Sequence, residues 1–198
     1  MTIRIVALGD STTAGTPGFQ SPVEAPPRGR GDETSQYAYW LMQAHPEWEV
    51  LNRGVNGERS DHIRARFDRD AIAAAPRAVV IIAGVNDVYQ GLSVAHVTEN
   101  LAAMYVQASR AGIAVVAGSI IPYNTATPEH NARMQQINDW IRGQAGLAFV
   151  DTRAAVAASN DPDRLLDSTD GLHPTAAGYR RMADAIQPIL ERVVRDNR

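Results

Sequence analysis

Three side chains near opposite ends of the chain have the chemistry of a nucleophile and its activating pair. Ser11 lies in GDSTTAG, close to the amino terminus, whereas Asp170 and His173 lie together in DSTDGLHP, near the carboxyl terminus. A serine hydroxyl attacks an acyl carbon only when a base removes its proton. The three residues therefore predict acyl transfer, with Ser11 as nucleophile, His173 as base and Asp170 as the carboxylate that orients the histidine.

Each motif also has an ordinary structural interpretation. A serine after a strand is commonly a turn or cap residue, and Asp170 could cap a turn from which His173 packs against the next helix. Gly171, between them, permits the turn that would bring the carboxylate back to the imidazole. The remaining histidines lie in or beside predicted helices among polar residues, where we expect them to be solvated: His45, His62, His96 and His130.

Acyl transfer also requires donors for the negative charge that develops on the carbonyl oxygen. Three candidates are the backbone N–H of Ser11, the N–H of Gly57 in NRGVNG and the side-chain amide of Asn86 in GVND. Gly57 lacks a Cβ and allows close approach of a ligand to the backbone. Asn-Gly and Asn-Asp pairs also mark ordinary turns, so these motifs alone leave both interpretations open.

Short runs rich in Val and Ile alternate with longer amphipathic stretches, a pattern typical of strand and helix units around a parallel sheet. The expected strands cover Ile3 to Leu8, Glu49 to Arg53, Ala78 to Ala83, Ala114 to Ser119 and Ala148 to Asp151. The expected helices cover Ser35 to Ala44, Ser60 to Ala75, Val94 to Ala111, Pro128 to Gln144 and Thr175 to Val194.

This alternation predicts an α/β fold, a three-layer α/β/α sandwich around a doubly wound, five-stranded parallel sheet. Ligands of such sheets bind beyond the carboxyl ends of the strands. The segments GDSTTAG, NRGVNGERS, GVNDVYQG and IPYNTATP each begin where a predicted strand ends, and DSTDGLHP follows the fifth strand. We therefore expect all five segments to converge on one edge of the sheet.

Composition narrows the classes of partner. The 198 residues predict one domain spanning 1–198, and a formal charge of −3 gives little electrostatic support for binding nucleic acid. The partner is expected to be a small molecule without strong charge. No apolar run is long enough for membrane insertion. The start MTIRIVALGDS lacks the pattern of a signal peptide and, with no cysteine in the chain, favours a cytoplasmic location.

Residues beside these motifs are candidates for the walls of a substrate pocket. Gly15 to Thr34 is a long irregular stretch that could fold over the site as a lid or form a flexible surface excursion. Plausible lining residues follow GVND and the fourth predicted strand, namely Val88, Tyr89, Tyr123 and Asn124.

Taken together, the motifs GDS, NxGxxG, GxND and DxxHP resemble those of the SGNH hydrolases, also called the GDSL esterase and lipase family. They occur in the family's order across nearly the whole chain. The resemblance implies a flavodoxin-like fold and no cofactor or metal. It also implies that Asp170 completes a catalytic triad and that four positions are family-defining, namely Ser11, Gly57, Asn86 and His173.

Three further positions, next to the nucleophile and next to Asn86, can be compared with the family's motifs. The leucine that usually follows the family's nucleophile is Thr12 here, and we expect this change to affect packing of the turn more than proton transfer. Asp10 and Asp87 match the family pattern. They are expected to hold the two loops by hydrogen bonds rather than to take part in the triad.

The resemblance leaves the substrate open among short-chain acyl esters, acetylated sugars, lysophospholipids and acyl thioesters. A second hypothesis is metal-assisted hydrolysis, with ligands from Asp10, Asp87, Asp170 and His173. A third is a noncatalytic flavodoxin-like module that binds a nucleotide or sugar, although the chain lacks G-x-G-x-x-G after the first strand.

Overall fold

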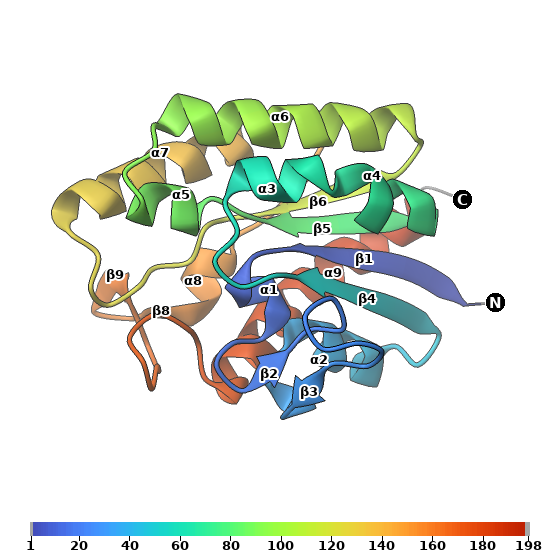
Figure 1. Ribbon diagram of the computed structural model, residues 1–198, viewed down its shortest axis with the longest axis horizontal. Coiled ribbons are helices and arrows are strands. Elements are labelled where there is room, and N and C mark those ends of the chain that lie inside the picture. The colour runs from blue at the N-terminus through green and yellow to red at the C-terminus, as the bar shows by residue number, and fades with distance from the viewer. Residues whose placement is uncertain (1, 197–198) are drawn as a thin grey trace.

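The computed structural model describes residues 2–196 and has one central parallel sheet of five strands in the order β4-β1-β5-β6-β7 (Figure 1). These strands are β1 (Ile3–Gly9), β4 (Trp48–Gly54), β5 (Ala78–Ile82), β6 (Ala114–Gly118) and β7 (Ala148–Val150). Two small antiparallel pairs lie outside the sheet, β2 (Phe19–Gln20) with β3 (Arg30–Gly31) and β8 (Ala157–Ala158) with β9 (Asp161–Leu165).

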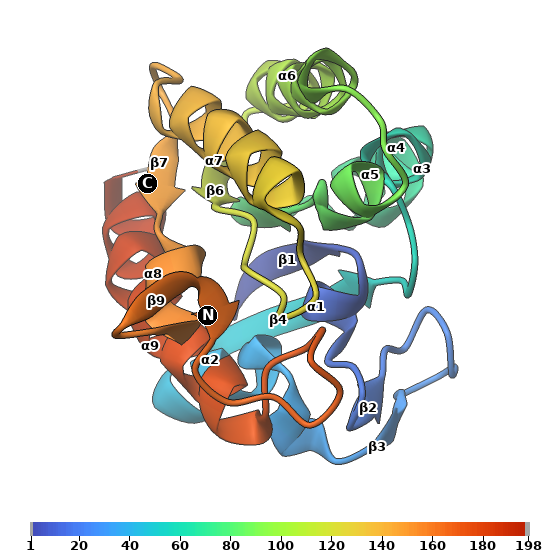
Figure 2. The same cartoon turned by 90° about the vertical axis from the view of Figure 1, so that its left-hand side faces the viewer.

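Helices cover both faces of the sheet (Figures 1 and 2). One apolar cluster joins the sheet to α3 (Ser60–Ala65), α4 (Phe67–Asp70), α6 (Val94–Arg110) and α7 (Pro128–Arg142). A second joins the opposite face to α2 (Tyr37–Ala44), α8 (Thr152–Val156) and α9 (Ala176–Asp196). All five residues of β5 are buried, as expected for a strand covered on both faces. The predicted three-layer α/β/α sandwich is confirmed.

The strand order places a crevice beside β1. The chain leaves β1 through α2 on one face and leaves the adjacent strand β5 through α6 on the other, which is the arrangement of a topological switch point. The ends of the strands are level, because Gly9 pairs with Gly54 in β4 and with Ile82 in β5. The loops after these three strands therefore begin side by side.

The stretch expected to be one helix over Ser60 to Ala75 is instead broken into α3, α4 and the 3-10 turn η2 (Ile72–Ala74). The break falls at Arg66, whose backbone leaves the helical region at φ −104° and ψ 6°. The Arg66 side chain is buried and binds three separate partners, so its contacts override the local helical pattern.

Several short elements have no counterpart in the prediction. They are α1 (Ser11–Ala14), α5 (Val85–Tyr89), the 3-10 turn η1 (Glu33–Ser35), α8 and the two small antiparallel pairs. Both α1 and α5 begin within a few residues of a strand's carboxyl end. Among the described residues, no helix has the length and apolarity needed to cross a bilayer.

Candidate active site

The predicted nucleophile and its activating pair lie within hydrogen-bonding distance. The His173 ring places Nε2 at 2.9 Å from Ser11 Oγ and Nδ1 at 2.7 Å from Asp170 Oδ2. Because the carboxylate can only accept, Nδ1 carries the proton and Nε2 accepts from the serine hydroxyl. The geometry is that of a serine, histidine and carboxylate triad able to transfer a proton from Ser11 to His173.

Ser11 owes its position to the turn that ends β1. It is the first residue of α1, where Asp10 caps the helix by accepting the N–H of Thr12 at 2.9 Å. As the first helical residue, Ser11 has an N–H with no acceptor within the helix, which leaves that donor available to a ligand. Burial raises the pKa of Asp10 to about 7.

Asp170 and His173 occupy a loop held together by its own hydrogen bonds. Asp170 Oδ1 accepts the N–H groups of Leu172 and His173, each at 2.8 Å. Ser168 Oγ donates to the His173 carbonyl at 2.7 Å and accepts the Gly171 N–H at 2.8 Å. Burial raises the pKa of Asp170, but the hydrogen bonds from His173 and from the backbone outweigh it and lower the value to about 2. The carboxylate therefore stays charged beside the histidine.

Two further candidate donors border the same space. Gly57 has φ +72° and would meet no atom within 4 Å if it carried a Cβ, so its backbone faces open space. Asn86 Nδ2 donates to the Glu58 carbonyl at 2.9 Å, a contact that fixes which end of the amide is the donor. The second hydrogen of that NH2 group is left for a ligand. Both residues line one cavity with Ser11 and His173.

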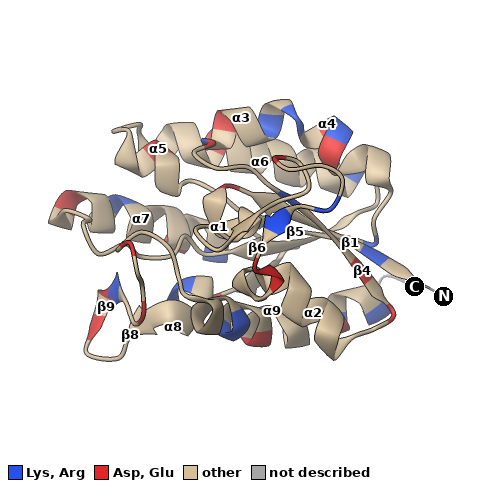
Figure 3. Ribbon diagram, turned by 60° about the horizontal axis from the view of Figure 1, so that its bottom comes forward, with Lys and Arg blue, Asp and Glu red and all other residues tan. Residues whose placement is uncertain are grey.

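This cavity has a volume of about 240 Å³. Its remaining walls come from Thr12, Asn56, Val85, Tyr89, Ile121, Tyr123 and Leu172. The lining contains no Asp, Glu or Arg, although acidic and basic residues occur along the ribbon in many other parts of the described molecule (Figure 3). Such a site suits a ligand without charge.

The expected pocket residues divide into two groups. Tyr89 and Tyr123 line the cavity, with their rings edge to face at 6.1 Å. Val88 was expected there but is fully buried in the core, whereas its neighbour Tyr89 in the short helix α5 is exposed. Asn124 does not line the cavity either, and its side chain instead accepts the Leu165 N–H at 2.8 Å.

The segment Gly15 to Thr34, all of it described, contributes no residue to the cavity lining. It packs beside the carboxyl end of β4, where Ser21 Oγ donates to the Gly54 carbonyl at 2.5 Å. In this structure the segment lies beside the cavity and does not cover it. The segment is attached to the loop that carries Gly57.

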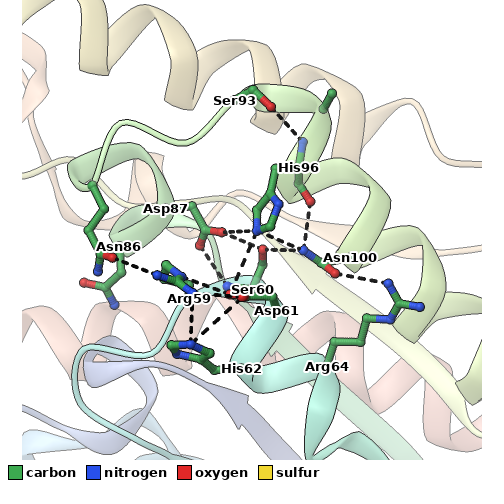
Figure 4. Close-up of polar contacts among 12 residues, drawn as sticks. Arg59, Ser60, Asp61, His62, Arg64, Asn86, Asp87, Ser93, His96 and Asn100 are labelled. Atoms are coloured by element: carbon green, nitrogen blue, oxygen red, sulfur yellow. Dashed lines mark hydrogen bonds and ion pairs between the residues drawn. The ribbon is translucent and has the colours of Figure 1, made fainter.

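Asp87 links two of the loops around the cavity. It is fully buried and accepts both Ser60 N–H, at 2.8 Å, and Ser60 Oγ–H, at 2.6 Å. Asn100 Nδ2 reaches Ser60 Oγ at 3.2 Å, and His96 Nε2 lies 3.6 Å from Asp87 Oδ1 (Figure 4). Asp87 thereby ties the residue after Asn86 to the end of the loop that contains Gly57.

The residues whose ligand atoms lie close enough together to hold a metal ion are not those that the metal hypothesis named. Asp10 caps α1, Asp87 binds Ser60, and Asp170 binds His173, so the four residues of the metal hypothesis are divided among three separate contacts. A different group brings its ligand atoms within 4.8 Å of one another, namely Asp61, Asp87 and His96. In that group Asp61 is also paired with Arg59 at 2.9 Å.

The other histidines are less solvated than expected. His45 contacts Glu47 at 3.1 Å and Glu191 at 2.9 Å, and His130 Nδ1 lies 2.6 Å from Tyr123 Oη. Only His62 is half exposed, at 50% of its side chain. His173 is nevertheless the histidine that meets Ser11.

Two residues that contact the loops around the cavity, Arg66 and Glu24, were missed in the sequence. Arg66 donates to the Gly9 carbonyl at 2.9 Å, to Glu58 at 2.6 Å and to Asp70 at 2.8 Å, which joins the nucleophile strand to the Gly57 loop. Glu24 binds Asn56, the residue before Gly57. The sequence carries no signal for either, since charged residues in loops and short helices are common on any surface.

Comparison with known proteins places these features in a family. Residues 7–181 match the model of the GDSL-like lipase/acylhydrolase family. An acetylxylan esterase from Geobacillus stearothermophilus is 28% identical over 169 residues, which cover 75% of this chain and 76% of the relative.

Solved structures of low identity share the fold. A putative lipolytic protein of the G-D-S-L family from Desulfitobacterium hafniense has a TM-score of 0.78 at 22% identity, covering 95% of this chain and 99% of that one. A GDSL-like lipase from Bacteroides thetaiotaomicron has a TM-score of 0.75 at 23% identity, covering 96% and 88%. The family match spans most of the sequence and includes every motif described above. The chain therefore belongs to the GDSL-like lipase/acylhydrolase family and is an ester-bond hydrolase.

Proposed function

We propose that this protein is a serine esterase that cleaves carboxylic esters through an acyl-enzyme intermediate. The observation that carries the proposal is the continuous contact from Ser11 Oγ through the His173 ring to Asp170, with distances of 2.9 and 2.7 Å. This contact supplies the nucleophile, its base and the group that fixes the tautomer of the base.

The proposed reaction has two halves. In the first, His173 Nε2 takes the Ser11 proton as Oγ attacks the acyl carbon, and the protonated histidine then donates that proton to the leaving alcohol. In the second, water enters, gives its proton to His173 and attacks the acyl-serine carbon, and Ser11 regains its proton as the acid leaves. The negative charge on the carbonyl oxygen is placed among the N–H groups of Ser11 and Gly57 and the amide of Asn86.

We propose that the acyl group is short and that the alcohol is neutral, as in an acetylated carbohydrate. The cavity of about 240 Å³ lies below the roughly 300–1,000 Å³ typical of ligand pockets, and no Asp, Glu or Arg lines it. Tyr89, with 61% of its surface exposed, offers a flat apolar surface at the cavity for the leaving group. The acetylxylan esterase relative supports the same substrate class.

Lysophospholipids and acyl thioesters form the alternative substrate class. One observation favours them, because Ile121 and Leu172 lie on the cavity wall and Leu172 is 40% exposed, which adds apolar surface near the opening. A long acyl chain would have to extend past this opening along the outer surface.

Labelling with an organophosphonate ester tests the nucleophile. We expect one adduct, mapped by peptide mass spectrometry to Ser11, and none in Ser11→Ala. Ser11→Ala should keep the parental melting temperature and lose about six decades in kcat on an activated ester. Hydrolysis by Ser11→Ala at the parental rate would exclude the proposed nucleophile.

A panel of p-nitrophenyl esters from acetate to laurate, read beside acetylated xylo-oligosaccharides and an acyl thioester, tests the substrate class. We expect kcat/KM to be highest for acetate and to fall as the chain lengthens. A maximum at eight carbons or more would favour the long-chain alternative and leave the nucleophile assignment untouched.

A further inference from the structure

Asn56, the residue before Gly57, directs its polar atoms to the segment Gly15 to Thr34. Its backbone N–H and its side-chain Nδ2 both donate to Glu24 Oε1, at 2.9 and 2.8 Å, and Nδ2 also lies 3.0 Å from Glu24 Oε2. Its Oδ1 accepts from Thr16 Oγ1 at 2.5 Å. A single carboxylate therefore holds both the backbone and the side chain of Asn56.

Glu24 is itself fixed to the sheet. Its N–H donates to the Ser21 carbonyl at 3.0 Å, and the fully buried Ser21 donates through Oγ to the Gly54 carbonyl at the end of β4. Glu24 is partly buried. Asn56 is thus connected to the end of β4 in two ways. The backbone runs from Gly54 through Val55 to Asn56, and hydrogen bonds run from Gly54 through Ser21 and Glu24 to Asn56.

The loop needs such an external hold because its internal bonds are weak. The Glu58 N–H reaches the Val55 carbonyl at 3.4 Å, which is long for an N–H···O bond. Gly57 is exposed, has a positive φ of 72° and has no atom within 4 Å of its Cβ position. Glycine in such a position has wide conformational freedom unless its neighbours are fixed.

We propose that Glu24 is a positioning residue for the reaction, which acts through Asn56 to hold the Gly57 N–H in the direction of the developing oxyanion. The inference rests on the proposed role of Gly57 as an oxyanion donor. The carbonyl carbon of Asn56 is bonded to the Gly57 nitrogen, so fixing Asn56 on both sides fixes that N–H. The donor then needs no reorganisation when charge develops on the substrate.

Glu24→Ala is compared with Glu33→Ala, which removes an exposed carboxylate of the same segment. On an activated acetate ester we expect Glu24→Ala to lower kcat by about tenfold to a hundredfold, the range expected when a catalytic group is misplaced by about 1 Å. KM should stay within about twofold, because the donor acts mainly in the transition state. Glu33→Ala should match the parent in both constants.

A double-mutant cycle with Asn56→Ala tests whether Glu24 acts through Asn56. Once Asn56 is truncated, Glu24→Ala should cost less than about twofold further, because the contact that transmits its effect is gone. Glu24→Gln should recover most of kcat, since its carbonyl can still accept the Asn56 N–H and its NH2 can donate to a rotated Asn56 amide.

Failure of the inference about Glu24 can be told apart from failure of the proposed function. Parental kcat in Glu24→Ala, or losses that add in the double mutant, would overturn the inference, and so would a loss carried by KM alone. If Glu24→Ala does not fold, Glu24→Asp replaces it, because it keeps the charge and withdraws the carboxylate by one methylene. A parent protein inactive on every ester would overturn the proposed function instead.

Discussion

The two sides of the cavity are held in opposite ways. Most hydrogen bonds that close the loop of Asp170 and His173 join residues at most five apart in the sequence, and one comes from farther away, from the Asn124 N–H to the Gly171 carbonyl at 2.7 Å. On the other side, the loop of Gly57 is held by Glu24, 32 residues from its partner Asn56, and by Asp87, 27 residues from its partner Ser60. The contact between Asp170 and His173 is therefore local, whereas the contacts that hold the oxyanion side join segments far apart in the sequence.

This difference explains which parts could be predicted. A spacing such as DxxH contains both partners of its main contact, so the sequence displays the pair. The contacts of Glu24 and Ser60 join distant segments, and neither residue stands out from other loop residues. Substitutions on the two sides of the cavity should therefore differ in how they affect activity and stability.

Of the substitutions that distinguish the two sides of the cavity, Asp170→Asn should lower kcat the most. The amide can donate to His173 Nδ1 and so stabilises the wrong tautomer, and kcat should fall by about four decades. Because the loop is partly exposed and locally closed, the melting temperature should change little. Steady-state kinetics and thermal unfolding on the same sample measure both quantities. A kcat within tenfold of the parent would show that Asp170 does not orient the base.

Asn86→Ala should reduce kcat by about two to three decades, the usual cost of losing one oxyanion donor. KM should change much less. Asn86→Asp serves as a matched variant, since it keeps the size of the side chain and removes the donor, and it should be at least as impaired. A rise in KM at unchanged kcat would instead make Asn86 a residue for ground-state binding.

Ser60→Ala should have a smaller effect on rate and a larger one on stability. It removes one of the two bonds that Ser60 gives to the buried Asp87 carboxylate, and a buried group that loses a partner costs about 1–3 kcal/mol of unfolding free energy. We expect kcat to fall only severalfold. Urea unfolding followed by circular dichroism measures the stability change, and an unchanged midpoint would mean that Asp87 does not depend on this contact.

Asp10→Asn should change the pH dependence of stability rather than the rate. Burial raises the pKa of Asp10 in the folded protein to about 7, so the unfolded chain releases this proton near pH 4 and the folded protein only near pH 7. In the parent protein, the free energy of unfolding that Asp10 contributes therefore decreases as the pH rises from about 4 to about 7. Asn keeps the cap on Thr12 and has no proton to lose.

The gain in unfolding free energy of Asp10→Asn over the parent should thus be larger at pH 8 than at pH 5, by roughly 2 kcal/mol. Denaturant titrations at the two values give this difference. The opposite behaviour is expected of Asp170, whose pKa of about 2 makes its contribution present above pH 4 and lost as the pH falls toward 2. An equal gain at both pH values would contradict the raised pKa of Asp10.

The fold was largely predictable because β-branched runs and amphipathic stretches repeat in strict alternation, and the five strands lie where they were expected. The helix expected over Ser60 to Ala75 was wrong because periodicity does not reveal that Arg66 binds across to Gly9. Val88 was predicted to line the cavity because it directly follows GVND, whereas in α5 its side chain is buried in the core. Local patterns report which residues are apolar but not the contacts that long-range packing creates.

Ser11 and His173 are 162 positions apart in the sequence, and this separation has a consequence for the newly made polypeptide. Translation produces the serine well before the imidazole that activates it. A nascent chain that has not yet emerged past residue 173 carries the hydroxyl without a base and cannot attack the esters around it. Reactivity is thereby withheld until the segment that joins Ser11 to His173 has been made.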